Sequence, residues 1–261
     1  MKNKFALTKA LNFLKKEFYD ISKYLFKDKI VRETLFSSNT KYYKFLRYFN
    51  LFFSLIIFVP VIASFWSLNL PHFLGYLIFA FGVYVVWIFE WVTNSIIFEE
   101  IKTFTIIQIA LHSFFGMFLE FYNKYEYYDD ILHITGGIWL ALIIFPIILS
   151  LELTFSRQKI PTLVWKVNLY TFFTSLSFGT IWEIFEFTSD QIFKNYPGYR
   201  MSQENSLFDT MTDLIYDAGG SILGIALFWY MLKKLNKNRD MYLLLERIGN
   251  ALRNFIDKKN D

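Results

Sequence analysis

Six stretches of this chain are long and apolar enough to cross a lipid bilayer, and they limit what it can fold into. The hydrocarbon core of a bilayer is about 30 Å thick, so a spanning helix needs about 20 mostly apolar residues. Composition agrees, because 54% of the residues are hydrophobic and 21% are aromatic. The sequence therefore predicts an all-α polytopic membrane protein. Its six predicted spans lie near residues 48–67, 71–92, 104–122, 130–150, 167–189 and 208–232.

Helix-start signals support two of these boundaries. Pro71 suits the first turn of the second span, where its missing N–H is not needed. Ser206, three residues before Asp209, is typical of a capping box that opens the sixth span.

Basic residues predict how the chain crosses the membrane. Residues 1–47 hold 12 of the 27 Lys and Arg residues and residues 233–261 hold eight, so 12 + 8 = 20 flank the predicted spans. Lys and Arg collect on the cytoplasmic side of membrane proteins. We therefore expect both termini in the cytoplasm, which an even number of spans allows.

The two ends of the chain have helical patterns of their own. Apolar residues recur every three or four positions, which predicts amphipathic helices that lie on the inner leaflet or pack against a partner helix. They are Leu7, Leu11, Leu14, Phe18, Ile21 and Leu25, then Met241, Leu245, Ile248, Leu252 and Phe255. The predicted organisation is a basic region 1–46, a membrane domain 47–233 and a basic helix 234–261. Membrane lipids are the expected partners, because anionic lipids explain the basic ends without a nucleic acid. The sequence predicts no oligomeric state.

Acidic and histidine side chains gather in one half of the predicted spans. An Asp near the centre of a span costs about 2.5–3.5 kcal/mol on insertion scales. Such residues are rare unless they face a cavity or a partner, so a functional site is the default hypothesis. Within each segment they are three or four residues apart and share one helix face. In chain order they are His112, Asp129, Asp130, His133, Glu183, Glu186, Asp190, Asp209, Asp213 and Asp217.

Some of these residues have simpler explanations. Asp129 and Asp209 stand at predicted helix starts, where an acid complements the helix dipole. His112, beside a serine, is by itself better explained as a hydrogen-bonded core histidine than as a ligand. Asp190 is expected to be solvated, and Glu90 to cap or reach out of the inner end of its span.

The remaining cluster predicts a metal site. Packed carboxylates repel one another unless a cation lies among them. The chain has no Cys, so carboxylate and imidazole are the metal ligands left to it. The cofactor that we expect is a divalent ion such as Zn²⁺, Mn²⁺ or Mg²⁺. Its predicted ligands are His112, Asp129, His133, Asp209, Asp213 and Asp217, with Glu183 and Glu186 as the predicted catalytic residues.

These motifs resemble those of the YjdF-like inner-membrane proteins over about residues 70–230. The shared pattern is a histidine in a mid-chain span, then "YDDILHITGG", "WEIFEF" and "DTMTDL". The pattern also looks distantly like the VanZ-like family. Here, however, the fifth span lacks Glu-x-x-x-Gln, and Asp217 stands where an Asn is common. The resemblance implies a six-span helical protein of the bacterial inner membrane and supplies no reaction.

Three functions are compatible with these residues. The first is a membrane-embedded, metal-dependent enzyme that acts on a lipid or lipid-linked substrate, with Glu183 or Glu186 as general base. The second is a small transporter coupled to ions or protons, which requires a polar path to the inner side. The third is a non-catalytic envelope protein in which the acids serve assembly.

Overall fold

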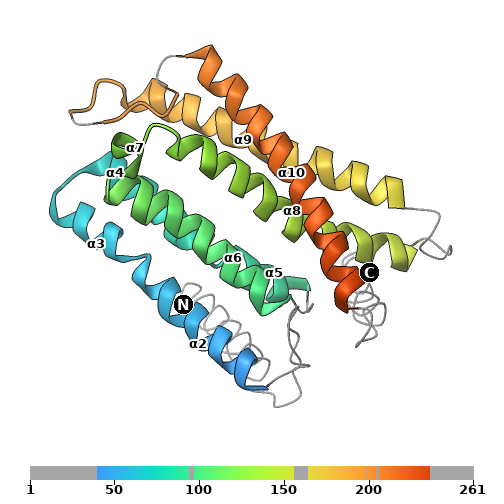
Figure 1. The fold of residues 1–261 in the computed structure, drawn as a ribbon. Helices are drawn as coiled ribbons and strands as arrows, with labels where there is room; N and C mark the ends of the chain where they lie inside the picture. The colour runs from blue at the N-terminus through green and yellow to red at the C-terminus, as the bar shows by residue number, and fades with distance from the viewer. Residues whose placement is uncertain (1–39, 94–96, 156–163, 198, 204–205, 236–261) are drawn as a thin grey trace, which may run out of the picture. The chain divides into compact units, whose positions relative to one another are not determined.

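The computed structural model describes residues 40–93, 97–155, 164–197, 199–203 and 206–235. Within these ranges all regular structure is helical and no strand is present (Figure 1), which confirms the all-α prediction. The amphipathic helices predicted near both termini lie outside the described residues.

Ten helical elements follow one another along the described chain. They are α2 (Thr40–Ile56), α3 (Val59–Trp66), α4 (Leu70–Gly82), α5 (Val85–Thr93), α6 (Glu99–Ile109), the π-helix η1 (Ala110–Phe118), α7 (Phe121–Lys124), α8 (Tyr128–Phe155), α9 (Val164–Phe193) and α10 (Leu207–Leu235). Large apolar side chains such as Phe52, Ile62 and Phe185 remain exposed on the helices, as expected for a protein whose outer surface contacts lipid.

The polytopic class is confirmed, but the predicted count of six spans is not. Four described segments are long and apolar enough to cross a membrane: Lys41–Trp66, Glu99–Phe118, Tyr128–Glu152 and Leu207–Leu232. A fifth arises if α4 and α5, which are bent by 41° at a short break, count as one span. α9 has 30 residues but is not among them. Its sequence carries many Ser and Thr residues and three acids, which lower its hydropathy.

Local sequence explains where several helices begin. Pro60 and Pro71 both lie in the first turn of their helices, where no N–H is required, so the prediction for Pro71 is confirmed. Asn69 caps α4, because its side chain accepts a hydrogen bond from the backbone N–H of His72 at 3.4 Å. Ser206 accepts one from the N–H of Asp209 at 3.3 Å, which confirms the cap predicted for α10.

Glycines bring α8 and α10 into close contact. A Cβ built on Gly220 would overlap the backbone carbonyl of Ile134 and lie 3.1 Å from the Cα of Gly137. One built on Gly224 would lie 2.7 Å from the Cβ of Ala141. Only helices whose backbones nearly touch make such contacts, so these residues form a small-residue interface of the kind common between membrane helices.

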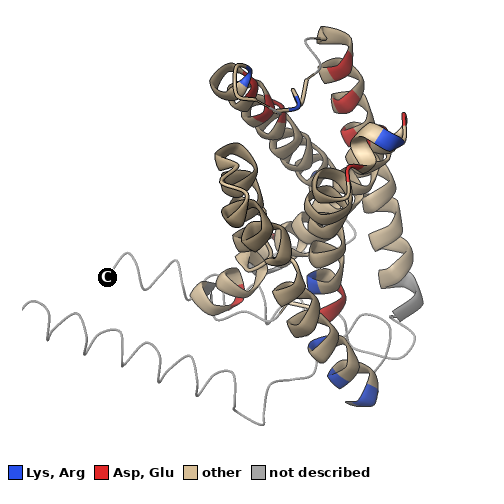
Figure 2. Cartoon of the chain, turned by 90° about the vertical axis from the view of Figure 1, so that its left-hand side faces the viewer, with Lys and Arg blue, Asp and Glu red and all other residues tan. Residues whose placement is uncertain are grey.

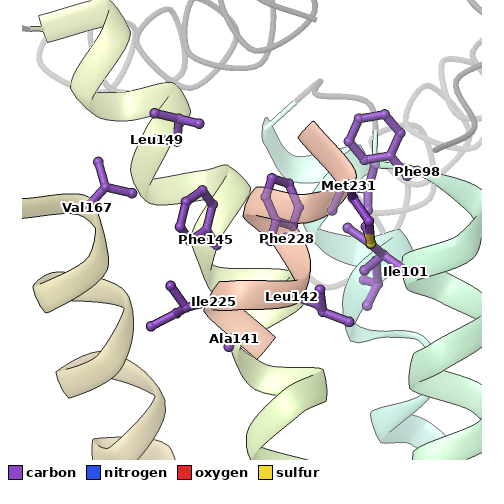
Figure 3. Close-up of a cluster of buried hydrophobic side chains, with 12 residues drawn as sticks. Phe98, Ile101, Ala141, Leu142, Phe145, Leu149, Val167, Ile225, Phe228 and Met231 are labelled. Carbon is purple, nitrogen blue, oxygen red and sulfur yellow. The ribbon is translucent and has the colours of Figure 1, made fainter. Parts of the chain in front are cut away.

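An apolar core packs α8, α9 and α10 together with α5 and α6. Phe145 of α8 and Phe228 of α10 lie at its centre, with ring centroids 4.7 Å apart (Figure 3). Val167 of α9 and Ile225 of α10 pack against the same cluster. Every one of these four side chains is buried.

A buried ion-pair network joins α2, α5 and α6. The ammonium of Lys102 lies 2.9 Å from a carboxylate oxygen of Glu90 and 2.9 Å from one of Glu99. Asn50 donates to the Glu99 carboxylate at 3.0 Å, and Glu90 accepts from the N–H of Ile97 at 2.6 Å. Glu90 therefore does not simply reach toward water at its helix end, as expected from the sequence, but is a buried ion-pair partner.

Replacing Lys102 by Met tests the importance of this network. Met keeps most of the volume but leaves Glu90 and Glu99 without their cation, and breaking a buried pair costs about 3–5 kcal/mol. We expect a clear fall in melting temperature in detergent. The control Lys44→Met changes an exposed lysine of α2 and should melt like the wild type. Equal melting temperatures of Lys102→Met and Lys44→Met would show that the network contributes little to stability.

Candidate metal site

His133 lies at the centre of a buried cluster contributed by three helices. Its Nε2 is 3.7 Å from a carboxylate oxygen of Asp129 and 3.7 Å from one of Asp213. The same nitrogen is 3.9 Å from Oε1 of Glu183. On the opposite edge of the ring, Nδ1 is 3.3 Å from Oδ1 of Asp217. The two ring nitrogens of His133 thus face different carboxylates.

The spacing around Nε2 suits a shared cation. Hydrogen bonds between nitrogen and oxygen are about 2.7–3.2 Å long, so distances of 3.7–3.9 Å are too long for direct bonds. Two ligands that are each about 2.1 Å from one ion are about 3.4 Å apart in tetrahedral geometry. One ligand atom each from His133, Glu183 and Asp213 lie within 4.8 Å of one another, and all three residues are buried. These residues, the ligand group, therefore fit a divalent ion.

The charge of the cluster also favours a cation. Among the described residues, His133 is the only ion-pair partner of Glu183, Asp213 and Asp217. One imidazole cannot balance three carboxylates. In addition, Oε1 of Glu183 is buried and has no hydrogen-bond partner within the described chain. Buried carboxylate oxygens are normally satisfied by a donor or a metal.

The helices bring their acids to one place because the acids lie at matching ends. Asp129 stands in the first turn of α8 and Asp209 in that of α10, while the acids of α9 lie near its C-terminus. In Figure 2, Asp and Glu positions of several helices gather toward one end of the bundle, and others lie nearer the opposite end. Gly179 completes the arrangement, because a Cβ at this position would overlap the carboxylate of Asp217.

The segment between α9 and α10 closes over the cluster through Asp190. This carboxylate accepts hydrogen bonds from the N–H groups of Ser202 at 2.8 Å and Gln203 at 3.0 Å, and from the Tyr199 hydroxyl at 2.9 Å. The amide of Gln203 then donates to Oε2 of Glu183 at 3.3 Å. Asp190 is 2% exposed, so the expectation that it is solvated was wrong.

His112 is not brought into the ligand group. It lies on the π-helix η1, and its Nδ1 is hydrogen-bonded to the hydroxyl of Tyr122. Burial, together with the nearby carboxylates of Asp129 and Glu186, raises the pKa of Tyr122 well above its usual range. Tyr122 therefore stays protonated and can donate to Nδ1, which leaves the proton of the neutral ring on Nε2 and no free lone pair for a metal. The interpretation of His112 as a hydrogen-bonded core residue fits this geometry better than a ligand role.

The other predicted residues lie around the ligand group. Asp129 is at its edge, with 23% of its side chain exposed. Asp209 is half-buried, one turn nearer the start of α10 than Asp213, and outside the group. Glu186 is half-buried one turn beyond Glu183, where its carboxylate interacts electrostatically with Asp129 and Glu183.

Two residues of the site, Gln203 and Gly179, were not predicted from the sequence. Gln203 lies in an irregular segment without periodicity, so no pattern indicated that it reaches Glu183. Gly179 precedes Glu183 by four residues on the same face of α9, and this spacing was a usable signal.

Comparisons with known proteins support the conclusion that the chain is a membrane protein. A family model described as a predicted membrane protein (DUF2238) matches residues 45–234. A protein of Thermotoga maritima, described as uncharacterized, is 32% identical over 162 residues, which cover 62% of this chain and 79% of the relative. No solved structure matches. The resemblance to the YjdF-like proteins is consistent with this family.

Proposed function

Since the chain belongs to the DUF2238 family of predicted membrane proteins, we propose that it is a membrane-embedded, metal-dependent hydrolase acting on a lipid or lipid-linked substrate. One observation carries this proposal: Nε2 of His133 shares a buried space with Glu183 and Asp213 at distances that suit a common divalent ion. A metal bound there would supply Lewis acidity and activate a water molecule.

In this proposal Asp217 holds His133 and is not itself a ligand. Its Oδ1 faces Nδ1, so it can accept the Nδ1–H and leave Nε2 free to bind the ion. Carboxylates that orient a metal-bound histidine in this way are common in metalloproteins. Asp129, at the edge of the group, could supply a fourth ligand atom.

Glu186 is the candidate general base. Glu183 belongs to the ligand group, whereas Glu186 lies one turn along the same helix and outside it. A carboxylate in this position can take a proton from a water molecule held between Glu186 and the ligand group. Gln203 keeps Glu183 in place by donating to its carboxylate.

The apolar core favours an enzyme over a transporter. A transport route would have to pass from the cluster to the opposite ends of α8, α9 and α10. That region is filled by Phe145, Val167, Ile225 and Phe228 (Figure 3). With the cytoplasmic termini proposed from the basic residues, the site lies in the outer half of a bacterial inner membrane, where a lipid headgroup can reach it.

The test of this function is metal content followed by turnover. Elemental mass spectrometry of the detergent-purified protein should find close to one divalent transition metal per chain. The protein in nanodiscs made from bacterial lipid extract should then release a lipid-derived product, which Glu186→Gln abolishes while its metal content is unchanged. Full metal with no product from any lipid fraction would support a metal-binding role and rule out hydrolysis of these lipids.

Gly179→Ala tests whether Asp217 orients His133. The methyl added at Gly179 would displace the Asp217 carboxylate, and neither Gly179 nor Asp217 belongs to the ligand group. Loss of such an orienting contact typically weakens metal affinity about 10–100-fold. We expect a decrease in that range in competition with a fluorescent chelator. Ser177→Ala, an exposed position on the same helix, is the control. Unchanged affinity in Gly179→Ala would rule out the orienting role.

A further inference from the structure

A second set of unpartnered polar atoms is buried between α9 and α10. Within the described chain, the hydroxyls of Ser175 and Ser221 have no hydrogen-bond partner, and neither does Oδ2 of Asp217. Ser175 and Ser221 are each 1% exposed, and Asp217 is 5% exposed. Buried polar atoms are nearly always satisfied, so three in one interface point to a bound water or ion.

The packing of α9 against α10 brings these atoms together. Gly179 faces Asp217, because a Cβ on this glycine would meet the Asp217 side chain. The helices are antiparallel, since Glu183, further along α9, meets an acid that comes earlier in α10. Steps of about one turn keep residues on the same face. The pairs in contact are Glu183 with Asp213 and Gly179 with Asp217. One further turn of each helix in the same register brings Ser175 to face Ser221.

The row of unpartnered polar side chains between α9 and α10 is closed at one end. One turn beyond Ser175, the buried Thr171 has a hydroxyl without a partner in the described chain, and Ile225 stands in the facing position. Ile225 belongs to the apolar core, with Val167 and Phe228 beside it (Figure 3). The set is therefore connected to the candidate metal site at Asp217 and closed at its other end.

We infer that Oδ2 of Asp217 and the hydroxyl oxygens of Ser175 and Ser221 bind a monovalent cation, with Na⁺ as the best fit. All three are hard oxygen ligands, which suit alkali and alkaline-earth ions. A water molecule would fill the space but leave the buried carboxylate charge unbalanced. Gly179 of α9 lies so close to Asp217 that one added methyl would overlap its Oδ2, so the space between the two helices is small, which favours Na⁺ over the larger K⁺.

This cation site is separate from the proposed divalent site. It uses the Asp217 oxygen that faces α9, whereas the other oxygen faces His133. Because the set is closed by apolar residues, the cation is a fixed part of the fold and not a transported ion. It neutralises Asp217 on the side away from the imidazole.

Thermal unfolding of the full-length protein in detergent tests the site. Melting is compared in sodium, potassium and choline chloride at equal ionic strength. A ligand present at about ten times its Kd should raise the melting temperature of a protein of this size by about 3 °C or more. We expect this rise in Na⁺ alone for the wild type. Ser221→Ala and Ser175→Ala should lose it, whereas Ser177→Ala, whose exposed hydroxyl bonds to Phe173 at 2.7 Å, should keep it.

Two results would overturn the inference. One is equal melting of the wild type in all three salts, which indicates a water or a protonated carboxyl. The other is a full Na⁺ effect in Ser221→Ala; if this variant does not fold, Ser175→Ala decides instead. Divalent metal is measured in the same samples, and Ser221→Ala should retain it. Loss of the Na⁺ effect with full divalent content separates this site from the proposed catalytic one.

Discussion

His133→Gln is expected to lose all but about a tenth of the bound divalent metal, since it removes the ligand nitrogen that faces Glu183 and Asp213. Gln keeps a similar volume but cannot place an imidazole nitrogen in the cluster. Asp213→Asn should have the same effect, because its Oδ1 lies 3.7 Å from Nε2 of His133. Elemental mass spectrometry on protein of matched monodispersity measures both losses.

His112→Gln is the matched control for this result. It removes a second histidine of the membrane domain, half-buried, that the sequence placed among the ligands. Its Nδ1 is already hydrogen-bonded to Tyr122, so the variant should keep its metal. If His112→Gln loses metal as completely as His133→Gln, then the metal site is not the one built around His133.

Gly220→Ala is expected to be among the most destabilising single-methyl changes in the protein. The new methyl would overlap the backbone of Ile134 and approach Gly137, and neither backbone can move without separating α8 from α10. Overpacking of this kind costs about 3 kcal/mol. The neighbouring Gly219→Ala has nothing within 4 Å of its added methyl and should be neutral or stabilising by up to about 1 kcal/mol.

Melting temperature and the yield of monodisperse protein compare the two variants. They differ by one position on the same turn of α10, so helix propensity affects both alike, and only the buried Gly220 faces α8. A Gly220→Ala protein that melts together with Gly219→Ala would show that α8 and α10 are not packed through their glycines.

Much of this fold could be predicted because long apolar segments leave a chain few options in a membrane. The helix class followed from length and composition, and the caps at Pro71 and Ser206 followed from local backbone chemistry. Spacing along one helix also identified the residues that now surround His133. Periodicity is a local property, so it is reliable within a helix.

What could not be predicted depends on contacts between segments. Nothing in the local sequence shows that His112 turns toward Tyr122, or that the irregular segment after α9 sends Gln203 to Glu183. The same holds for Lys102, which appears as a lone charge in the sequence but lies between two glutamates in the fold. Such partners are set by tertiary packing.

The polarity of α9 has a consequence for how the protein enters the membrane. This helix packs against α8 and α10, but its own composition does not meet the requirement for an independent span. Its buried face carries Thr171, Ser175, Glu183 and Asp190, groups that lipid cannot satisfy. During synthesis α9 should therefore be held beside the insertion machinery until α10 emerges, so that the two helices enter the bilayer together as a hairpin. A chain truncated before α10 is expected to leave α9 on the cytoplasmic side, where protease added to that side can cut it.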